Sequence, residues 1–427
     1  MSGAPAHVIG AGLAGLSAAV RLAEAGRRVV VYDSAKAAGG RCRSYEDTAL
    51  GLTIDNGNHL LLSGNRAALD YVDTIGGRGA LTIAGEARFD FADLRTGERW
   101  TLRPNAGRVP WWVLVASRRV PGARLAEYLA PLGILRASAT ATIGEAMVCA
   151  GPLYDRLWQP VLLAALNTQV PESAAALAAP VLRETLAAGG EACRPVIATG
   201  GLSAAFVEPA LTYLKERGGA VRLGTRVRAL PTEGGRVSKL SLADGEIELG
   251  PDEDVVLATP PWVAGELVPG IATPTEYRGI VNAHFRLVPP SGVPPILGII
   301  GGLSEWLFAY PDRLSVTISA ADRLLDRSRE DLAAAIWAEV SQLAGLHSAP
   351  LPRWQIVKEK RATFAATPAQ AAMRPKARTA QTNLALAGDW TDTGLPATIE
   401  GAIRSGSIAA SVLQRGDGGA SPRVSKG

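Results

Sequence analysis

Apolar and polar positions near the N-terminus follow first a strand-like and then a helical period. Residues 6–10 form a short apolar run typical of a buried strand, and residues 13–26 carry apolar side chains at helical spacing. Residues 29–32 form a second apolar run, which ends at Asp33. Strand, helix, strand and acid together predict one βαβ unit of about 30 residues.

Further along the chain, the pattern changes from helical to alternating. Residues 108–150 and 151–193 are predicted to be helical, the second stretch being rich in Ala and Leu. From residue 220, alternation between Gly-rich turns predicts short strands. The predicted elements are strands at 220–223, 225–230, 237–242, 247–249 and 254–258, strands of a second sheet at 280–288 and 314–320, an amphipathic helix at 329–346, a buried strand at 384–388 and a helix from about 397 to 414.

The composition is that of a folded protein with room for two domains. Of the 427 residues, 47% are hydrophobic and 20% are charged. The net charge of +4 is small and no basic run interleaves with aromatic residues, so nucleic-acid binding is not predicted, while weak attraction to anionic lipid stays open. Cys42, Cys149 and Cys193 lie too far apart in the sequence to suggest a metal site or a disulfide framework.

No apolar run reaches the roughly 20 residues that a membrane-spanning helix needs. The first predicted strand begins within about six residues, which leaves no room for a signal peptide. We therefore expect a cytoplasmic protein, and a peripheral position at the inner face of a membrane stays open.

The turn between the first strand and the helix has the spacing of a dinucleotide site. Its residues are Gly10, Ala11, Gly12, Leu13, Ala14 and Gly15. The first glycine permits a tight turn, the second lets the backbone approach a pyrophosphate, and the third lets helix and strand pack closely. The helix N-terminus then offers free N–H groups to an anion. Asp33 lies where an acid accepts hydrogen bonds from a ribose, so the unit predicts a dinucleotide but does not decide between FAD and NAD.

Three more segments carry glycine, arginine or acidic residues beside predicted strands. Residues 39–43 read Gly-Gly-Arg-Cys-Arg, which brings the backbone and a cation near a ligand, although an ordinary turn with solvated arginines has the same pattern. Residues 55–60 read Asp-Asn-Gly-Asn-His-Leu. Residues 386–402 contain a strand that ends in Gly-Asp, followed about eight residues later by a helix N-terminus. An acid there can accept a bond from a ribityl hydroxyl, and the helix dipole would face the N1–C2=O edge of a flavin.

These motifs, in this order and at both chain ends, resemble the amine oxidase and phytoene desaturase superfamily of FAD enzymes. Within it, the chain is most similar to the squalene-associated FAD-dependent desaturases of hopanoid pathways. The segments that carry this resemblance are residues 39–44, 53–66, 359–368 and 387–402. One departure is Asp33, because this superfamily usually has a glutamate at that position.

The resemblance implies FAD as cofactor and assigns a role to each matching residue. It places Gly10 to Gly15 at the pyrophosphate and Asp33 at the adenosine ribose. The other implied contacts are Gly40 and Arg41 along the phosphates, Gly57, Asn58, His59 and Leu60 near the isoalloxazine, Val227 at the adenine, Gly388 and Asp389 at the pyrophosphate and ribityl chain, and Ala397, Thr398 and Ile399 at the flavin ring.

The predicted fold class is α/β, with a discontinuous Rossmann-like FAD-binding domain. We expect that domain to comprise residues 1–75, 195–265 and 355–415. An α+β substrate domain, with a mixed sheet and a helical subdomain, is expected from residues 76–194 and 266–354. Residues 416–427 are rich in Gly, Ser and Pro and are predicted to be a disordered tail.

Among flavin chemistries, two features argue against an amine oxidase. Those enzymes resemble one another in a lysine that holds water at flavin N5, yet this chain has no lysine between Lys239 and Lys358. They also place an aromatic residue beside the flavin where this chain has Thr398. A carotenoid-type desaturase stays open, because it too needs an apolar tunnel. A non-enzymatic flavin-binding scaffold is the remaining alternative.

The apolar middle of the chain suits an isoprenoid lipid substrate. Trp111 and Trp112 precede Arg118 and Arg119, an arrangement typical of a segment at a membrane interface. At about 0.8 kcal/mol per buried CH₂, a thirty-carbon chain would be taken from a bilayer rather than from water. The same tryptophans are equally typical of the core of a helical subdomain.

The resemblance implies reduction of hydroxysqualene to squalene in hopanoid and squalene biosynthesis. Loss of the allylic hydroxyl as water needs a proton, and His59 is the candidate donor, because its ordinary pKa of about 6.5 suits the task. A packing role for His59 stays open, and Asn167, Arg194 and Glu400 are alternative donors. The physiological electron donor is not indicated by the sequence.

Overall fold

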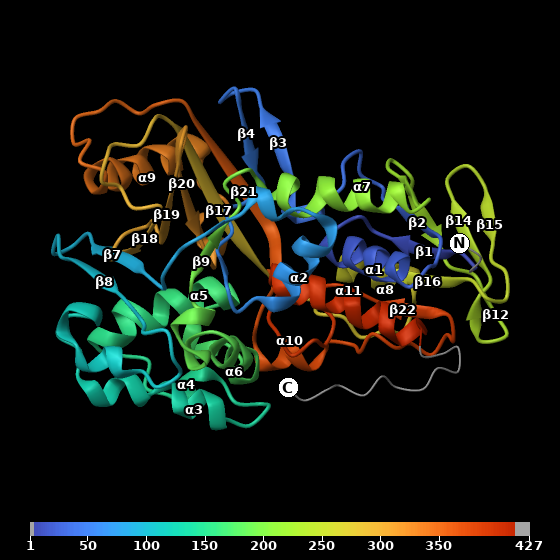
Figure 1. The fold of residues 1–427 in the computed structure, drawn as a ribbon, viewed down its shortest axis with the longest axis horizontal. Helices are drawn as coiled ribbons and strands as arrows, with labels where there is room; N and C mark the ends of the chain where they lie inside the picture. The colour runs from blue at the N-terminus through green and yellow to red at the C-terminus, as the bar shows by residue number, and fades with distance from the viewer. Residues whose placement is uncertain (1–3, 415–427) are drawn as a thin grey trace.

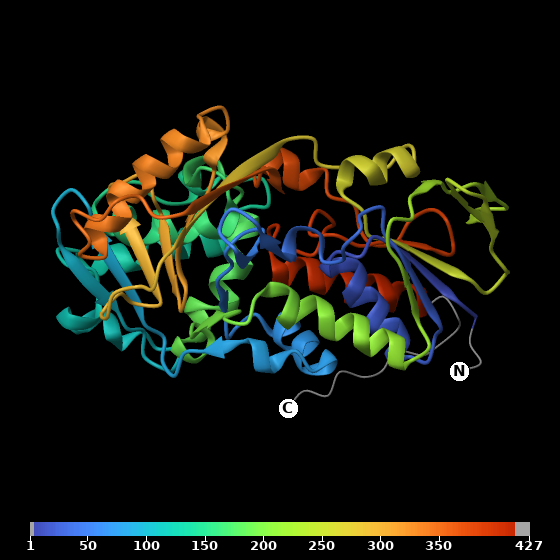
Figure 2. The ribbon, with the colours of Figure 1, turned by 90° about the horizontal axis from the view of Figure 1, so that it is seen from above.

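A five-stranded parallel sheet lies toward the end of the molecule that carries the N-terminus (Figures 1 and 2). The computed structural model describes residues 4–414, so the predicted tail at 416–427 lies outside the described residues. The strand order is β10 (Ala220–Arg222), β2 (Val29–Tyr32), β1 (Ala6–Ile9), β16 (Asp254–Leu257) and β22 (Leu384–Leu386). Because the strands are parallel, their carboxyl ends share one edge of the sheet, where ligands bind in such folds.

Helices from the two ends of the chain pack against each other beside this sheet (Figure 1). They are α1 (Leu13–Glu24) and α11 (Ile399–Gln414). A Cβ on Gly406 would overlap the backbone of Ala14, so only glycine allows this close approach. Ser17 Oγ donates a hydrogen bond to the Ile403 carbonyl at 2.8 Å. The nucleotide-binding unit is thus assembled from N-terminal, middle and C-terminal parts of the chain.

The second layer is a seven-stranded mixed sheet with helix α9 (Arg329–Leu343) on one face (Figure 1). Leu332, Ile336 and Val340 of α9 share a core with Leu314 and Val316 of the sheet. The strand order is β21 (Trp354–Phe364), β17 (Tyr277–Arg286), β20 (Arg313–Ile318), β19 (Trp306–Tyr310), β18 (Ile296–Ile300), β7 (Phe89–Asp93) and β8 (Arg99–Leu102). This arrangement confirms the predicted fold class of a Rossmann-like sheet together with a mixed sheet.

Short helices cover the other face of the mixed sheet. Those in the same core as this face include α5 (Gln159–Leu166) and α6 (Ala175–Glu184). The helix expected over 108–150 is wrong, because the prolines and glycines of this segment leave no uninterrupted stretch longer than ten residues, and short isolated helices are marginally stable. That segment instead contains η3 (Trp111–Leu114), η4 (Ala116–Arg118), η5 (Leu125–Leu129), α3 (Pro131–Arg136) and α4 (Ile143–Ala146).

The remaining strands form small sheets outside the two large ones. Small sheets are formed by β3 (Ser44–Asp47) with β4 (Leu52–Asp55), by β5 (Leu61–Leu62), β9 (Pro195–Ile197) and β6 (Thr82–Ile83), by β11 (Val227–Ala229), β14 (Lys239–Leu242) and β15 (Glu246–Glu248), and by β12 (Thr232–Glu233) with β13 (Arg236–Val237). The other helices include α2 (Arg66–Ile75), α7 (Glu208–Glu216), α8 (Pro261–Leu267) and α10 (Pro368–Ala372). The predicted domain boundaries stay a prediction, and the one at residue 355 falls at the start of β21, which pairs with β17 of the mixed sheet.

Candidate functional site

Of the three glycines in the turn after β1, one has space for a side chain and two do not. Gly10 has a φ of +112°, and a Cβ there would lie 2.5 Å from the Ala258 carbonyl oxygen. A Cβ on Gly15 would overlap the Gly10 carbonyl oxygen, which explains the close packing of α1 on β1. A Cβ on Gly12 would meet nothing within 4 Å. Gly12 is also the N-cap of α1 and makes no side-chain bond, so the open space lies at a helix N-terminus.

The predicted ribose acid and the second glycine motif lie beside this turn. Asp33 accepts hydrogen bonds from the backbone N–H of Ala11 at 2.7 Å and of Ala35 at 2.8 Å. Its carboxylate therefore holds the turn in place and keeps lone pairs for hydroxyl donors. The Gly39 N–H donates to the Ala11 carbonyl at 2.8 Å, and a Cβ on Gly40 would lie 3.5 Å from Gly12 Cα.

An ion pair joins motifs from opposite ends of the chain. Arg41 and Asp389 approach to 2.8 Å, and Arg41 also donates to the Ala362 carbonyl. Arg374 is buried and donates to the Asp389 carbonyl at 3.4 Å. Burial lowers the pKa of Arg374 to about 10, so it stays cationic at neutral pH. The exposed Arg41 side chain can also contact a pyrophosphate, while Asp392 and Glu359 lie near enough to the two guanidinium groups to offset their charge.

The segment predicted to contact the isoalloxazine lies against the mixed sheet. Asn58 Nδ2 donates to Thr317 Oγ1 at 3.1 Å. His59 Nδ1 lies 2.9 Å from the Gly57 carbonyl, which can only accept, so Nδ1 carries the proton. Burial lowers the pKa of His59, and the neutral ring then has Nε2 as an acceptor. His59 can therefore pass on a proton only after taking one up. Leu60 is half-buried and packs against the apolar core on the face of the mixed sheet opposite α9.

The start of α11 is held by one hydrogen bond within its first turn and one from the Gly388-Asp389 turn. Thr398 Oγ1 accepts from the Gly401 N–H at 3.0 Å, so Thr398 caps the helix, with Ala397 and Ile399 half-buried on either side. The Gly388 N–H donates to Ser405 Oγ at 2.8 Å. These bonds keep the helix N-terminus close behind the Gly388-Asp389 turn.

The alternative proton donors are already engaged in structural bonds. Buried Glu400 accepts from the N–H groups of Ala67 and Ala68 at 3.1 and 2.8 Å, so it caps α2. Asn167 Nδ2 donates to Thr363 Oγ1 at 2.9 Å, while its Oδ1 accepts from the Ala320 N–H at 2.7 Å. Arg194 forms a surface pair with Glu191 at 3.5 Å. None of these three groups is free to deliver a proton.

Val227, the predicted adenine contact, lies near the ribose acid. It begins β11 and is buried. The Thr225 N–H, two residues earlier, donates to the Asp33 carbonyl at 2.8 Å. The structure thus brings every predicted cofactor residue to the edge of the parallel sheet or to the segments that face the mixed sheet. Their individual contacts to a flavin stay a prediction.

The sequence did not point to Glu305, a carboxyl between β18 and β19. It accepts from the Ser319 N–H at 2.7 Å, and burial raises its pKa to about 7. The folded state disfavours the carboxylate, so the stability from the neutral carboxyl is fully present below the ordinary pKa near 4.5 and is lost as the pH rises through 7.

We expect Glu305→Gln to raise the thermal unfolding midpoint at pH 8 and to leave it nearly unchanged at pH 5. The amide keeps an acceptor for Ser319 without a charge, so it removes only the cost of ionisation. Differential scanning calorimetry at both pH values measures this. An equal change at the two pH values would contradict the buried, proton-retaining carboxyl.

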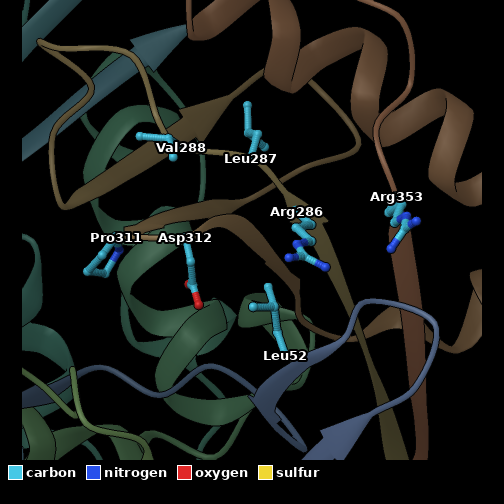
Figure 3. A pocket seen from close by; sticks show the side chains of 7 residues that line it. All are labelled: Leu52, Arg286, Leu287, Val288, Pro311, Asp312 and Arg353. Atoms are coloured by element: carbon cyan, nitrogen blue, oxygen red, sulfur yellow. The ribbon is translucent and has the colours of Figure 1, made fainter.

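A separate hollow of about 560 Å³ lies at the far end of β17 (Figure 3). Two of its three charged side chains have partners: Arg286 donates to the Leu50 carbonyl at 2.7 Å, and Asp312 pairs with Arg313 at 2.9 Å. None of its lining residues belongs to the glycine turn or to the flavin-contact segments. The lining residues are Leu52, Arg286, Leu287, Val288, Pro311, Asp312 and Arg353.

The open space at Gly12, the uncapped start of α1, the exposed Arg41 beside Asp389 and the Asp33 carboxylate fit an FAD molecule. The fold and this site define an FAD-dependent oxidoreductase. Residues 13–414 match the family model described as flavin containing amine oxidoreductase.

Sequence comparison with known proteins identifies a family within the FAD-dependent oxidoreductases. The chain is 56% identical to the hydroxysqualene dehydroxylase of Rhodopseudomonas palustris, over 95% of this chain and 97% of that protein. It is 54% identical to the enzyme of the same name from Sinorhizobium fredii, with the same coverage. The solved structure of cyclohexylamine oxidase from Brevibacterium oxydans has a TM-score of 0.71 at 16% identity, over 97% of this chain and 99% of that one, which shows a shared fold. The chain belongs to the hydroxysqualene dehydroxylase family within the flavin-containing amine oxidoreductases, which confirms the resemblance found in the motifs.

Proposed function

We propose that this chain reduces hydroxysqualene to squalene, with bound FAD as the hydride carrier. The observation that carries the proposal is the 56% identity over nearly the whole chain to a hydroxysqualene dehydroxylase. It is supported by the assembly of the motifs from residues 10–15, 39–43 and 386–402 at one sheet edge. Reduced FAD supplies a hydride to an allylic carbon, whose hydroxyl leaves as water after taking up a proton.

The chain's own residues hold the cofactor and shape the pocket. Gly12 and the N-terminus of α1 would face the pyrophosphate, with Arg41 neutralising its charge. Asp33 would accept ribose hydroxyls. The apolar core between the mixed sheet and α5 and α6 would keep water from the reacting carbon.

His59 stays the candidate proton donor. We expect His59→Ala to reduce turnover of hydroxysqualene about 100-fold, because general acid catalysis typically contributes that much, while FAD stays bound. Anaerobic product formation by the FAD-loaded variant measures this, and flavin absorbance serves as the control for loading. Full turnover with flavin bound would show that His59 is only a packing residue.

Two product assays test the proposed reaction against desaturation. Hydroxysqualene is incubated with enzyme and dithionite, and squalene is incubated separately with enzyme and an electron acceptor. Squalene from the first assay supports dehydroxylation. Dehydrosqualenes from the second, with nothing from the first, would replace the proposal by desaturation.

We further propose that the segment 108–148 contacts a membrane surface. Of the twelve large hydrophobic residues exposed in the described part of the chain, eight lie in this segment, including Trp111, Leu114 and Leu129. Trp112, by contrast, is buried against Tyr128, so the two adjacent tryptophans have different roles.

The charge of the same segment also favours an anionic lipid surface. Residues 108–148 contain five arginines and two glutamates, a net charge of +3 out of the +4 of the whole chain. Most of the net charge therefore lies beside the exposed apolar side chains. Within residues 4–414, no helix combines the length and apolarity needed to cross a membrane.

We expect replacement of Trp111, Leu114 and Leu129 by serine to reduce binding to anionic vesicles about tenfold, through loss of buried apolar area. Co-sedimentation with phosphatidylglycerol vesicles measures this. Val288→Ser with Leu351→Ser, which removes exposed apolar side chains elsewhere, is the matched control. Equal binding by both variants would contradict the proposed surface.

A further inference from the structure

The face of the mixed sheet opposite α9 is apolar on one strand and polar on the strand beside it. Leu314, Val316 and Ile318 of β20 pack with α9, so the alternate residues Ser315 and Thr317 point to the opposite face. On β19, Trp306 and Phe308 point to that opposite face and belong to its apolar core. The opposite face is therefore apolar at β19 and polar at β20.

The neighbouring strand β17 continues the polar part. Asn282 lies directly across from Thr317, and His284 directly across from Ser315. Thr317 Oγ1 donates to Asn282 Oδ1 at 2.8 Å, and His284 Nδ1 lies 2.9 Å from Ser315 Oγ. His284 and Ser315 are fully buried, and Asn282 nearly so. Four polar side chains thus form two rows across β17 and β20.

The polar rows adjoin the segment predicted to contact the isoalloxazine. Asn58 Nδ2 donates to Thr317 Oγ1 at 3.1 Å, and the Asn58 N–H donates to Asn282 Oδ1 at 3.4 Å. A Cβ on Gly57 would lie 3.1 Å from Asn282 Nδ2. Gly57 and Asn58 are therefore in direct contact with this part of the sheet.

Three buried polar atoms in this region have no hydrogen-bond partner among the described residues. They are Asn58 Oδ1, His284 Nε2 and Trp306 Nε1. Trp306 lies directly across from Thr317, so its ring is on the same face as the polar rows. An unpaired buried polar group costs about 1–3 kcal/mol, and native proteins retain few of them without a functional reason. A hydroxyl group that accepts from the Trp306 N–H and donates to Asn58 Oδ1 would satisfy two of these atoms.

We propose that Asn58, Asn282, His284, Trp306 and Thr317 form the site that binds the hydroxyl group of the substrate. The Trp306 N–H donates to the hydroxyl oxygen, and Asn58 Oδ1 accepts its hydrogen. Burial and the nearby Arg313 lower the pKa of His284 to about 3, so the ring is neutral and places no charge in this pocket. The site deepens the proposed function and rests on it.

The hydroxyl site explains how a long, nearly uniform chain is positioned. An apolar tunnel alone binds an isoprenoid chain in several registers with similar energy, because each shift exchanges one apolar contact for another. A hydrogen-bonding site rejects an analogue that lacks the hydroxyl, because its own polar groups are then left unpaired. The five residues therefore fix the hydroxyl-bearing carbon beside the segment that is predicted to contact the flavin.

The test compares hydroxysqualene with squalene as ligands of the oxidised, FAD-bound enzyme. Both are titrated in detergent micelles, and the flavin absorption spectrum reports binding. We expect the unmodified enzyme to bind hydroxysqualene more tightly. Trp306→Phe removes only the indole N–H and keeps most of the apolar ring. We expect it to weaken hydroxysqualene binding about tenfold and to leave squalene binding unchanged.

Trp100→Phe is the matched control. Trp100 and Trp306 are both 6% exposed with unpartnered indole N–H groups, and both contact Phe91, at 5.5 and 5.7 Å between ring centroids. Trp100 lies on β8, however, at the far edge of the sheet. We expect its replacement to change the binding of neither ligand. Thr317→Val provides a second variant that removes a hydroxyl at nearly constant volume.

The possible results separate the hydroxyl site from the proposed function. If the unmodified enzyme converts hydroxysqualene but Trp306→Phe and Thr317→Val both keep its binding preference, the hydroxyl site is wrong and the proposed function stands. Equal weakening of both ligands by these variants also overturns the site, because it shows general disruption of the pocket. If the unmodified enzyme neither converts nor prefers hydroxysqualene, the proposed function itself fails.

Discussion

Replacing Gly12 by glutamate will abolish FAD binding while leaving the protein folded. A Cβ at Gly12 meets nothing within 4 Å, and the backbone there has a φ of −75°, which any residue adopts. The apoprotein therefore tolerates a side chain. That side chain would occupy the space at the start of α1 where the pyrophosphate is expected, and its charge would repel the phosphates. We expect the affinity for FAD to fall at least ~100-fold.

Flavin absorbance after reconstitution and thermal unfolding of the apoprotein measure the two halves of this prediction. Gly15→Ala is the contrasting variant, since its Cβ would overlap the Gly10 carbonyl and must disturb the packing of α1. Gly15→Ala should lose stability and flavin together, whereas Gly12→Glu should lose flavin alone. Normal FAD content in Gly12→Glu would show that the cofactor does not approach this turn.

Glu400→Ala will produce the largest loss of stability among these variants. The buried carboxylate accepts two backbone N–H groups at the start of α2 and one bond from Arg404 at 2.9 Å. Removing it leaves buried donors unpaired and takes a negative charge from a helix N-terminus. We expect the free energy of unfolding to fall by about 3 kcal/mol.

Urea unfolding of the apoprotein measures this loss. Glu145→Ala is the matched control, because Glu145 also accepts at a helix N-terminus, in the exposed capping box with Thr142. That variant should lose clearly less stability than Glu400→Ala, because water can replace the lost bond at an exposed helix end. Similar losses in the two variants would show that burial of Glu400 adds nothing to its role as a cap.

The nucleotide-binding half of the fold could be predicted because its signals are local. The βαβ unit, Asp33 and the Gly388-Asp389 turn each lie within a short stretch whose pattern has one physical explanation. The pairing of Arg41 with Asp389 was not predicted as a contact, because the two residues are 348 positions apart and meet only when α1 and α11 pack.

The rest of the site depends on long-range contacts that no local pattern shows. Glu400 follows a glycine-rich turn near the expected flavin ring, which suggested chemistry, but its partners on α2 lie 332 and 333 positions away. The polar rows of β17 and β20 alternate with apolar residues, so the sequence alone does not tell which face of the sheet packs against α9 and which lies against Gly57 and Asn58. In the segment 108–150, the apolar content suggested a helix. The prolines and glycines of this segment divide it into short 3₁₀ and α-helical elements instead.

The most direct test of the account is a single turnover under anaerobic conditions. FAD-bound enzyme is reduced with one equivalent of dithionite and mixed with hydroxysqualene, and flavin oxidation and squalene formation are followed together. We predict one squalene per flavin oxidised, with no oxidation when squalene replaces hydroxysqualene. Reduced flavin that persists in the presence of hydroxysqualene, with no squalene formed, would contradict the account.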